Sequence, residues 1–335
     1  MRFFKNQVDT KKMAEESEFS VKYFLILLEK EGLDVDVSGK TDFCVTHLRN
    51  LEAADSGCLT FYTGEDSDAL SCLTNCVLIC KPEVVAPDDV TRIITQEPKL
   101  AFYIIAQGFQ GSSPESYTHP SAIIDSEAVI EANCYIGPYA VIGKCRIGIG
   151  VVIHSHVHLY DETEIGNRVV VESGSCIGVT GQIWAWGVDG KRWMMPQFGG
   201  VKVEDDCFIG SNVSIARGAL QDTVIQKGVR ISHGTMIGHN CHIGKETFLS
   251  NRIAISGSTD VGAFCFLGSG AVLQPGLHIG DQITIGAGAI VTKNFYEPGL
   301  VIAGNPARIV KKVKEGDQLK GVPVIKKWKD ENARF

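Results

Sequence analysis

The dominant pattern of the chain is an aliphatic residue that returns at every sixth position. The longest unbroken series runs from Ile225 to Val291, and each of its positions holds Ile, Leu or Val. A period of six fits neither an amphipathic helix, whose period is 3.6, nor a single strand, whose period is two. Earlier members of the series, with a one-residue slip between Ile142 and Ile147, are Ile124, Ile130, Ile136, Ile142, Ile147, Ile153, Leu159, Ile165, Val171, Ile177, Val203, Ile209 and Ile215.

This period predicts a β-solenoid. Three six-residue strands make one triangular coil, and neighbouring coils pair their backbones about 4.8 Å apart. The aliphatic residue points into the coil, and the Gly that often follows it, as at Gly238 and Gly244, is expected to turn the corner. We therefore predict a mainly β fold, with the solenoid over residues 119–307.

Residues 21–110, before the solenoid, have the pattern of a small α/β domain. Helices are expected in "SVKYFLILLEKEG", starting after Ser20, and in "PKLAFYIIAQGF". Short strands are expected in "CLTFYTG" and "CVLICKP". A linker rich in Ser and Pro follows, and the flanks are an N-terminal extension (1–20) and a basic C-terminal segment (308–335).

Two segments interrupt the period of six, and both precede a candidate site. They are "GVTGQIWAWGVDGKRWMMPQFGG" after Ile177 and "ARGALQDT" after Ile215. Loops that leave a rigid scaffold are where sites are usually built. His239 and Asn240 follow, and we expect them about one and a half coils after the second interruption. An imidazole is suited to remove a proton before attack on a thioester, and backbone N–H groups at a corner are suited to hold the developing oxyanion.

The other histidines raise the alternative of a zinc site. The solenoid of the γ-class carbonic anhydrases carries an H-x4-H pair, whereas His233, His239 and His242 give only H-x5-H and H-x2-H. The run "HSHVHLYDE", with His154, His156 and His158, is better explained by solvated or intersubunit histidines. We predict no metal and no bound cofactor.

Composition narrows the class of protein further. The chain has 335 residues and a formal charge of −7, which argues against a nucleic-acid partner. The apolar run from Tyr23 to Leu28 is too short to span a bilayer, and the N-terminus lacks the apolar core of a signal peptide. The eleven Cys are scattered without a CxxC pair, as expected for free thiols. We expect a cytoplasmic protein without membrane insertion.

Four motifs resemble the UDP-3-O-acylglucosamine N-acyltransferases (LpxD) of lipid A biosynthesis, over about residues 20–310. "ADSGCLTFYTG" resembles the nucleotide-binding domain of that family, "GQIWAWGVDGKRWMMPQFGGVKVEDD" and "ARGALQDT" resemble its two loops, and "IGHN" resembles the segment with its catalytic His. The resemblance implies a hexapeptide-repeat left-handed parallel β-helix and a homotrimer with sites between solenoids. It implies that His239 takes the proton of an amine and that Asn240 helps to position the thioester arm.

The resemblance also assigns binding residues. A nucleotide-linked amino sugar would contact Phe61, through base stacking, together with Tyr62 and Arg217. The acyl donor would contact Gly257, Ala287, Ala289, Lys293 and Arg308.

The last motif leaves the donor and the pathway open. The ending "GNPARIVKK" resembles coenzyme-A-dependent sugar N-acetyltransferases. The main hypothesis is an N-acyltransferase acting on a nucleotide-linked amino sugar in cell-surface glycan or lipopolysaccharide biosynthesis, with an acyl-CoA donor. The first alternative is the lipid A enzyme itself, with an acyl carrier protein (ACP) as donor. An alternative of another class is a non-catalytic hexapeptide scaffold.

Overall fold

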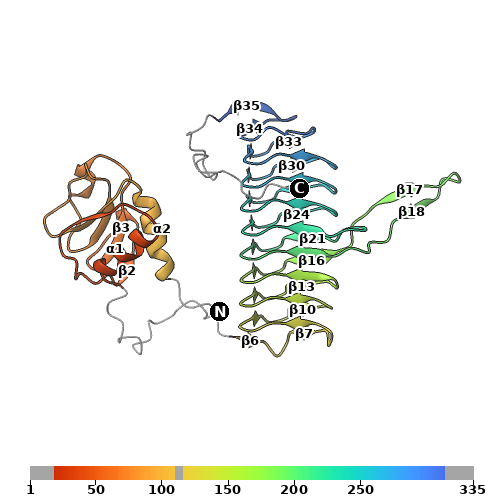
Figure 1. Ribbon diagram of the computed structural model, residues 1–335, viewed down its shortest axis with the longest axis horizontal. Helices are drawn as coiled ribbons and strands as arrows, with labels where there is room; N and C mark the ends of the chain where they lie inside the picture. Colours follow the sequence, from red (N-terminus) through yellow and green to blue (C-terminus); the bar gives the residue numbers. More distant parts are fainter. Residues whose placement is uncertain (1–18, 110–115, 314–335) are drawn as a thin grey trace. The chain divides into compact units, whose positions relative to one another are not determined.

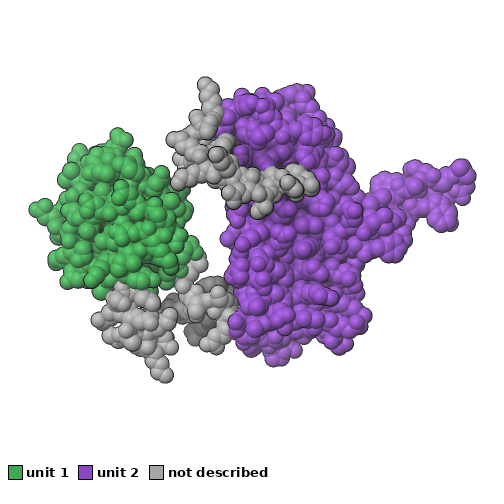
Figure 2. All heavy atoms as spheres, viewed as in Figure 1, with its two compact units in different colours: residues 1–112 green, residues 113–335 purple. Residues whose placement is uncertain are grey.

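The computed structural model describes residues 19–109 and 116–313. The chain separates into two compact units, residues 1–112 and residues 113–335 (Figure 2). Residues 1–18 of the predicted N-terminal extension and residues 314–335 of the basic C-terminal segment lie outside the described residues.

The first unit is a five-stranded sheet with two helices. The strand order is β1-β5-β4-β3-β2, and only β1 is antiparallel to its neighbour. The bounds are β1 (Asp36–Ser38), β2 (His47–Leu48), β3 (Cys58–Phe61), β4 (Val77–Cys80), β5 (Thr91–Ile94), α1 (Val21–Lys30), α2 (Pro98–Gly108), and the 3-10 helices η2 (Leu51–Ala53) and η3 (Ser67–Leu70). Both predicted helices and the predicted strands β3 and β4 are present. The Ser20 hydroxyl caps α1 by accepting a hydrogen bond from the Tyr23 N–H at 3.2 Å.

The two faces of this sheet carry different cores, and Phe61 and Tyr62 belong to different ones. Phe61 packs against Phe102 of α2, with ring centroids 4.8 Å apart, in the cluster beneath the helices. Tyr62 packs against the opposite cluster, and its hydroxyl donates to the Asp66 carbonyl at 2.9 Å. Successive strand residues point to opposite faces. These two rings therefore do not lie on one face of the sheet.

The second unit is the predicted solenoid, with three parallel sheets as its faces (Figure 1). The nine-stranded face holds β7 (Ile123–Ile124), β10 (Val141–Ile142), β13 (His158–Leu159), β16 (Cys176–Val179), β21 (Ser214–Ala216), β24 (Met236–Ile237), β27 (Ala254–Ile255), β30 (Val272–Leu273) and β33 (Ile290–Val291). The eight-stranded face holds β8 (Val129–Ile130), β11 (Arg146–Ile147), β14 (Thr163–Ile165), β19 (Val201–Val203), β22 (Thr223–Ile225), β25 (His242–Ile243), β28 (Asp260–Val261) and β31 (His278–Ile279).

The eleven-stranded face closes the triangle. It holds β6 (Tyr117–Thr118), β9 (Tyr135–Ile136), β12 (Val152–Ile153), β15 (Val170–Val171), β20 (Phe208–Ile209), β23 (Arg230–Ile231), β26 (Phe248–Leu249), β29 (Phe266–Leu267), β32 (Thr284–Ile285), β34 (Leu300–Ala303) and β35 (Arg308–Lys312). Only β35 runs antiparallel, where it folds back on β34. The chain visits the nine-, eight- and eleven-stranded faces in that order on each coil.

The predicted aliphatic series forms the core. Every member from Ile136 to Val291 is at most 3% exposed, and burial of each such side chain contributes about 1.5–3 kcal/mol. The corners differ from the prediction. The left-handed backbone lies at the third residue after the aliphatic one, as at Asn240 with φ +56°. Gly238 instead allows close approach, because a Cβ there would lie 2.5 Å from the Gly257 nitrogen of the next coil.

Neither helix of the described residues is long and apolar enough to cross a bilayer.

Candidate functional site

Both interruptions leave the solenoid at one corner, between the nine-stranded and eight-stranded faces. The first joins β16 to β19, the second joins β21 to β22, and His239 lies between β24 and β25. These strands are direct neighbours within each face. We call residues 180–200, 217–222, 238–241 and 256–259 the site corner. The predicted distance of one and a half coils is wrong, because Ile215 pairs directly with Ile237 in the adjacent coil.

The longer interruption is a hairpin that projects from the solenoid (Figure 1). Its strands β17 (Trp184–Trp186) and β18 (Arg192–Met194) are antiparallel, and every residue in them is exposed. The guanidinium of Arg192 lies over the rings of Trp184 and Trp186, 5.5 and 4.8 Å from their centroids.

The base of the hairpin is fastened to the shorter loop. The N–H of Phe198 donates to the Ala219 carbonyl at 2.7 Å, and the N–H of Gly199 donates to the Gly218 carbonyl at 3.1 Å. Arg217 adds a third bond, from its Nε to the Gly199 carbonyl at 2.7 Å. Arg217, which was predicted to bind the nucleotide sugar, therefore ties the two loops together.

The hydrogen bonds of Asn240 fix the tautomer of His239. Asn240 Oδ1 accepts from the backbone N–H of Ala219 at 3.0 Å, and Asn240 Nδ2 lies 3.3 Å from the Gln221 carbonyl. The atom facing His239 Nδ1 at 3.1 Å is thus an acceptor, so Nδ1 carries the hydrogen. In the neutral imidazole, His239 Nε2 then carries the lone pair that a general base needs.

Two glycines and a glutamine surround this imidazole. A Cβ on Gly257, in the next coil, would lie 2.4 Å from His239 Nε2. A Cβ on Gly181 would lie 2.9 Å from His239 Cβ, 3.1 Å from its Cδ2 and 3.1 Å from Gln197 Oε1. The absence of these two side chains lets the imidazole lie close against the backbone of both glycines. Among the described residues, the N–H of Gly257 donates to no acceptor.

The remaining predicted donor residues are spread over the solenoid. Lys293 follows β33 and lies on the same corner as His239, three coils further along. Ala287 lies at the corner between the eleven- and nine-stranded faces, and Arg308 lies in β35. Ala289 is fully buried in the core, which excludes its side chain from lining a surface groove. Phe61 and Tyr62 belong to the first unit.

The histidine run does not gather into one cluster. His156 stacks on Tyr139 with ring centroids 5.1 Å apart, and His158 stacks on Tyr160 at 4.0 Å. Residues 19–109 and 116–313 contain no group of three His, Cys, Asp or Glu that could hold a metal ion. Burial raises the pKa of the Cys241 thiol, next to Asn240, to about 11, so this thiol stays protonated at neutral pH and is not a nucleophile.

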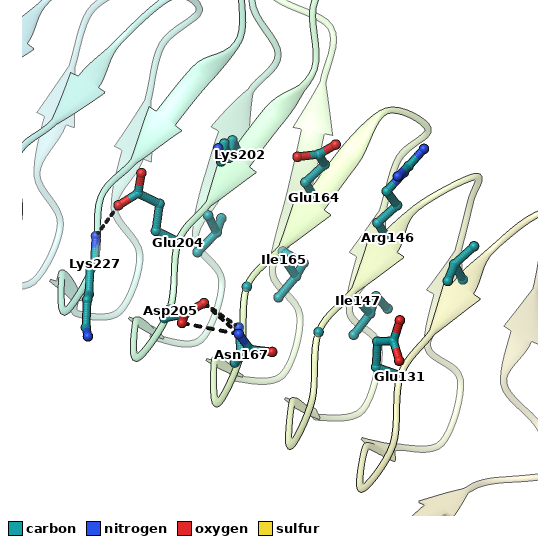
Figure 3. Close-up of a pocket in the computed structure, with 14 residues that line it drawn as sticks. Glu131, Arg146, Ile147, Glu164, Ile165, Asn167, Lys202, Glu204, Asp205 and Lys227 are labelled. Carbon is teal, nitrogen blue, oxygen red and sulfur yellow. Dashed lines mark hydrogen bonds between the residues drawn. The ribbon is translucent and has the colours of Figure 1, made fainter.

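A groove of about 620 Å³ runs across the eight-stranded face, away from His239 (Figure 3). Arg146, Glu164 and Lys202 project from successive strands with alternating charge. At its rim, Asp205 Oδ1 accepts from the Asn167 N–H at 2.8 Å, and Glu204 accepts from the Lys227 N–H at 3.0 Å.

Gln197 and Gly181 were not predicted as site residues. Gln197 lies in the Pro-Gln of the long interruption, a pair within the motif that carries the family resemblance, and that was the only signal available. Its proximity to His239 depends on how the hairpin returns to the coil, which the sequence pattern does not specify.

The chain is similar to known proteins over most of its length. The family model "Hexapeptide repeat of succinyl-transferase" matches residues 200–219 and 259–293. UDP-3-O-acylglucosamine N-acyltransferase of Coxiella burnetii is 31% identical over 82% of this chain and 86% of its own. The enzyme of the same name from Herminiimonas arsenicoxydans is 31% identical over 80% of this chain and 84% of its own.

Solved structures with the same fold are also acyltransferases by name. LpxA from Acinetobacter baumannii has a TM-score of 0.53 and 25% identity, over 58% of this chain and 73% of that chain. UDP-N-acetylglucosamine acyltransferase of Francisella novicida has a TM-score of 0.53 and 23% identity, over 58% and 69%. These likenesses confirm the left-handed β-helix, and the curated relatives favour the lipid A alternative over the coenzyme-A hypothesis.

Proposed function

The chain belongs to the UDP-3-O-acylglucosamine N-acyltransferase family, and from this premise we propose that it moves an acyl group from a thioester to the amine of UDP-3-O-acylglucosamine in lipid A biosynthesis. The observation that carries the proposal is the His239–Asn240 pair at the corner where both loops meet. In the neutral imidazole this arrangement leaves a lone pair on Nε2, which lies close against Gly257 of the next coil.

In the proposed reaction, His239 acts as general base. The amine nitrogen attacks the thioester carbonyl carbon while His239 Nε2 takes one of its protons. Asn240 accepts from Nδ1–H throughout and stabilises the imidazolium that forms, a role that differs from the predicted contact with the thioester arm. The carbon–sulfur bond then breaks, and the proton passes from Nε2 to the departing sulfur.

Backbone groups of the corner would stabilise the oxyanion of the tetrahedral intermediate. The N–H of Gly257 is suited to this role, because it has no acceptor within the described part of the chain and Gly257 lies next to His239 Nε2. A side chain at position 257 would collide with His239 Nε2 and displace the base.

The donor would lie along the site corner. Lys293 is three coils from His239, about 14 Å at roughly 4.8 Å for each coil. Its ammonium group suits a phosphate of the pantetheine arm that ACP and coenzyme A share. From the resemblance of the motifs we further propose ACP as the donor, a homotrimer with sites between solenoids, a uridine bound by the first unit, and action in the cytoplasm.

The experiment is a donor and acceptor comparison with the purified full chain. We expect thiol release and N-acylated product from 3-hydroxyacyl-ACP and UDP-3-O-acylglucosamine. Acetyl-CoA and 3-hydroxybutyryl-CoA, tested with UDP- and dTDP-linked amino sugars, should give little product. Transfer from a CoA thioester to a different amino sugar, with none from the carrier protein, would contradict the lipid A assignment. Silence with every pair would favour a scaffold.

A further inference from the structure

Gln197 carries a buried hydrogen-bond acceptor that the fold does not use. It lies between β18 and β19, where the hairpin returns to the solenoid. Its Nε2 donates to the Met195 carbonyl at 3.0 Å, which holds the amide in place. Its Oε1 is buried and has no partner among the described residues. An unsatisfied buried acceptor is costly, and in a native structure it calls for an explanation.

The unused oxygen lies next to the proposed base. Gln197 Oε1 and His239 Cδ2 each come within 3.1 Å of the point where a Gly181 side chain would begin. Cδ2 is bonded to Nε2 in the imidazole ring, so the oxygen lies on the side of His239 that carries the neighbour of the basic nitrogen. Because Gly181 has no side chain, nothing from that residue separates the two groups.

We infer that Gln197 Oε1 accepts a hydrogen bond from the reacting amine and thereby selects amines over hydroxyls as acyl acceptors. This inference rests on the proposed N-acyl transfer. A neutral amine has two hydrogens and one lone pair. One hydrogen goes to His239 Nε2, the lone pair attacks the carbonyl carbon, and the second hydrogen points to Gln197. That second hydrogen is never transferred, and it remains as the N–H of the product amide.

A hydroxyl acceptor cannot satisfy the same set of groups. Its single hydrogen is needed by His239, so a lone pair of its oxygen would face the Gln197 oxygen. Two acceptors then oppose each other in a buried place, which is how a site rejects an analogue that lacks a donor. For the amine, the nitrogen becomes positive as the new bond forms, so the hydrogen bond to Gln197 strengthens along the reaction.

The test compares two acceptors that differ only at the reacting atom. We would measure kcat/KM for UDP-3-O-acylglucosamine and for its analogue with a hydroxyl in place of the amine. Gln197→Met keeps the length of the side chain but removes the acceptor. We expect it to lower kcat/KM for the amine by about 10- to 100-fold, with the value for the hydroxyl analogue unchanged or raised. Gln197→Glu keeps an acceptor oxygen and should recover part of the preference for the amine.

Controls distinguish a loss of preference for the amine acceptor from structural damage by the substitution. Gln182 lies exposed on the outgoing arm of the same interruption, so Gln182→Met should leave both acceptors unaffected. An equal loss for both acceptors in Gln197→Met would overturn the inference and indicate a packing role. If the wild-type chain transfers no acyl group to the amine, the proposed function fails, and the inference fails with it. An active wild type with an unchanged acceptor ratio in Gln197→Met overturns the inference alone.

Discussion

The charged groove and the site corner are two parts of one solenoid with opposite character. The groove encloses about 620 Å³ and is lined by charged side chains from successive coils. The site corner holds an imidazole whose Nδ1 faces an acceptor and a buried amide oxygen without a partner among the described residues. The first region is a hollow lined by exposed charges, whereas the second contains a buried polar atom that the fold leaves unpaired.

Burial of an unpaired polar atom, and not size, separates the two regions. In the groove Arg146, Glu164 and Lys202 are exposed, and two carboxylates are engaged by the backbone N–H groups of Asn167 and Lys227. At the corner two glycines lie close against His239, and Gln197 Oε1 is buried without a partner among the described residues. A polar atom that the fold leaves buried and unsatisfied at a cost is a stronger indication of chemistry than a hollow whose charges are exposed to water.

The strongest test of this contrast removes the base. His239→Ala should keep the fold and lower turnover by about two to four orders of magnitude, the usual contribution of a general base. His242→Ala is the matched control, because His242 is an exposed side chain on the next strand, bonded to Asp260 at 2.8 Å. A near-normal rate in His239→Ala would show that the amine enters neutral and needs no protein base.

The next test places a side chain against the imidazole of His239. In Gly257→Ala the new methyl group would lie 2.4 Å from His239 Nε2, so the imidazole must move. We expect turnover to fall by about 100-fold, as misplacement of a catalytic group by roughly 1 Å can do. The double variant with His239→Ala should be no slower than His239→Ala alone. Additive losses would mean that Gly257 acts independently of the base.

Substitutions in the groove should have a smaller effect on kcat/KM. Lys202→Ala and Arg146→Ala each remove one exposed charge from the ladder on the eight-stranded face. Since neither side chain lies at the site corner, kcat/KM should stay within about twofold of wild type, with little change in stability. A loss comparable to that of Gly257→Ala would show that the groove also holds a reactant.

The smallest effect concerns stability and pH at the rim of the groove. The backbone N–H of Asn167, followed by its side-chain amide, holds the pKa of Asp205 below its ordinary value. A lowered pKa means that the carboxylate stabilises the fold above pH about 4 and that this contribution is lost as the pH falls further. Asp205→Asn should lower the melting temperature by at most about 2 °C at pH 7.

The difference in melting temperature between wild type and Asp205→Asn should shrink as the pH falls from about 4 through the lowered pKa of Asp205. A difference that stays constant with pH would mean that geometry and not charge accounts for the contact between Asp205 and Asn167.

The sequence pattern was sufficient to predict the solenoid. Each coil repeats the same local rule, so the positions from Ile136 to Val291 could be assigned to the core one by one. In the first unit, strands β1, β2 and β5 were missed, because two to four residues carry too little periodicity. The corner glycines were assigned the wrong role, since the closeness of the next coil is a property of stacking.

The candidate site was predicted only in part. His239 and Asn240 stand out in the sequence, but their hydrogen bond to each other and to Ala219 depends on where the second loop ends. Ile215 and Ile237 are 22 residues apart, whereas coils without insertions repeat every 18 residues. The second loop adds residues without adding a coil. Counting residues along the chain therefore placed His239 too many coils away from this loop. The unpaired oxygen of Gln197 is a tertiary property that no motif reveals.

The hairpin of the long interruption gives the protein a built-in optical reporter. Of its four tryptophans, three lie in this one element, at positions 184, 186 and 193. All three are more than half exposed, with basic side chains over their rings. Intrinsic fluorescence therefore monitors chiefly the hairpin, and a blue shift on adding a ligand or on self-association would show, without any label, that these rings have left water.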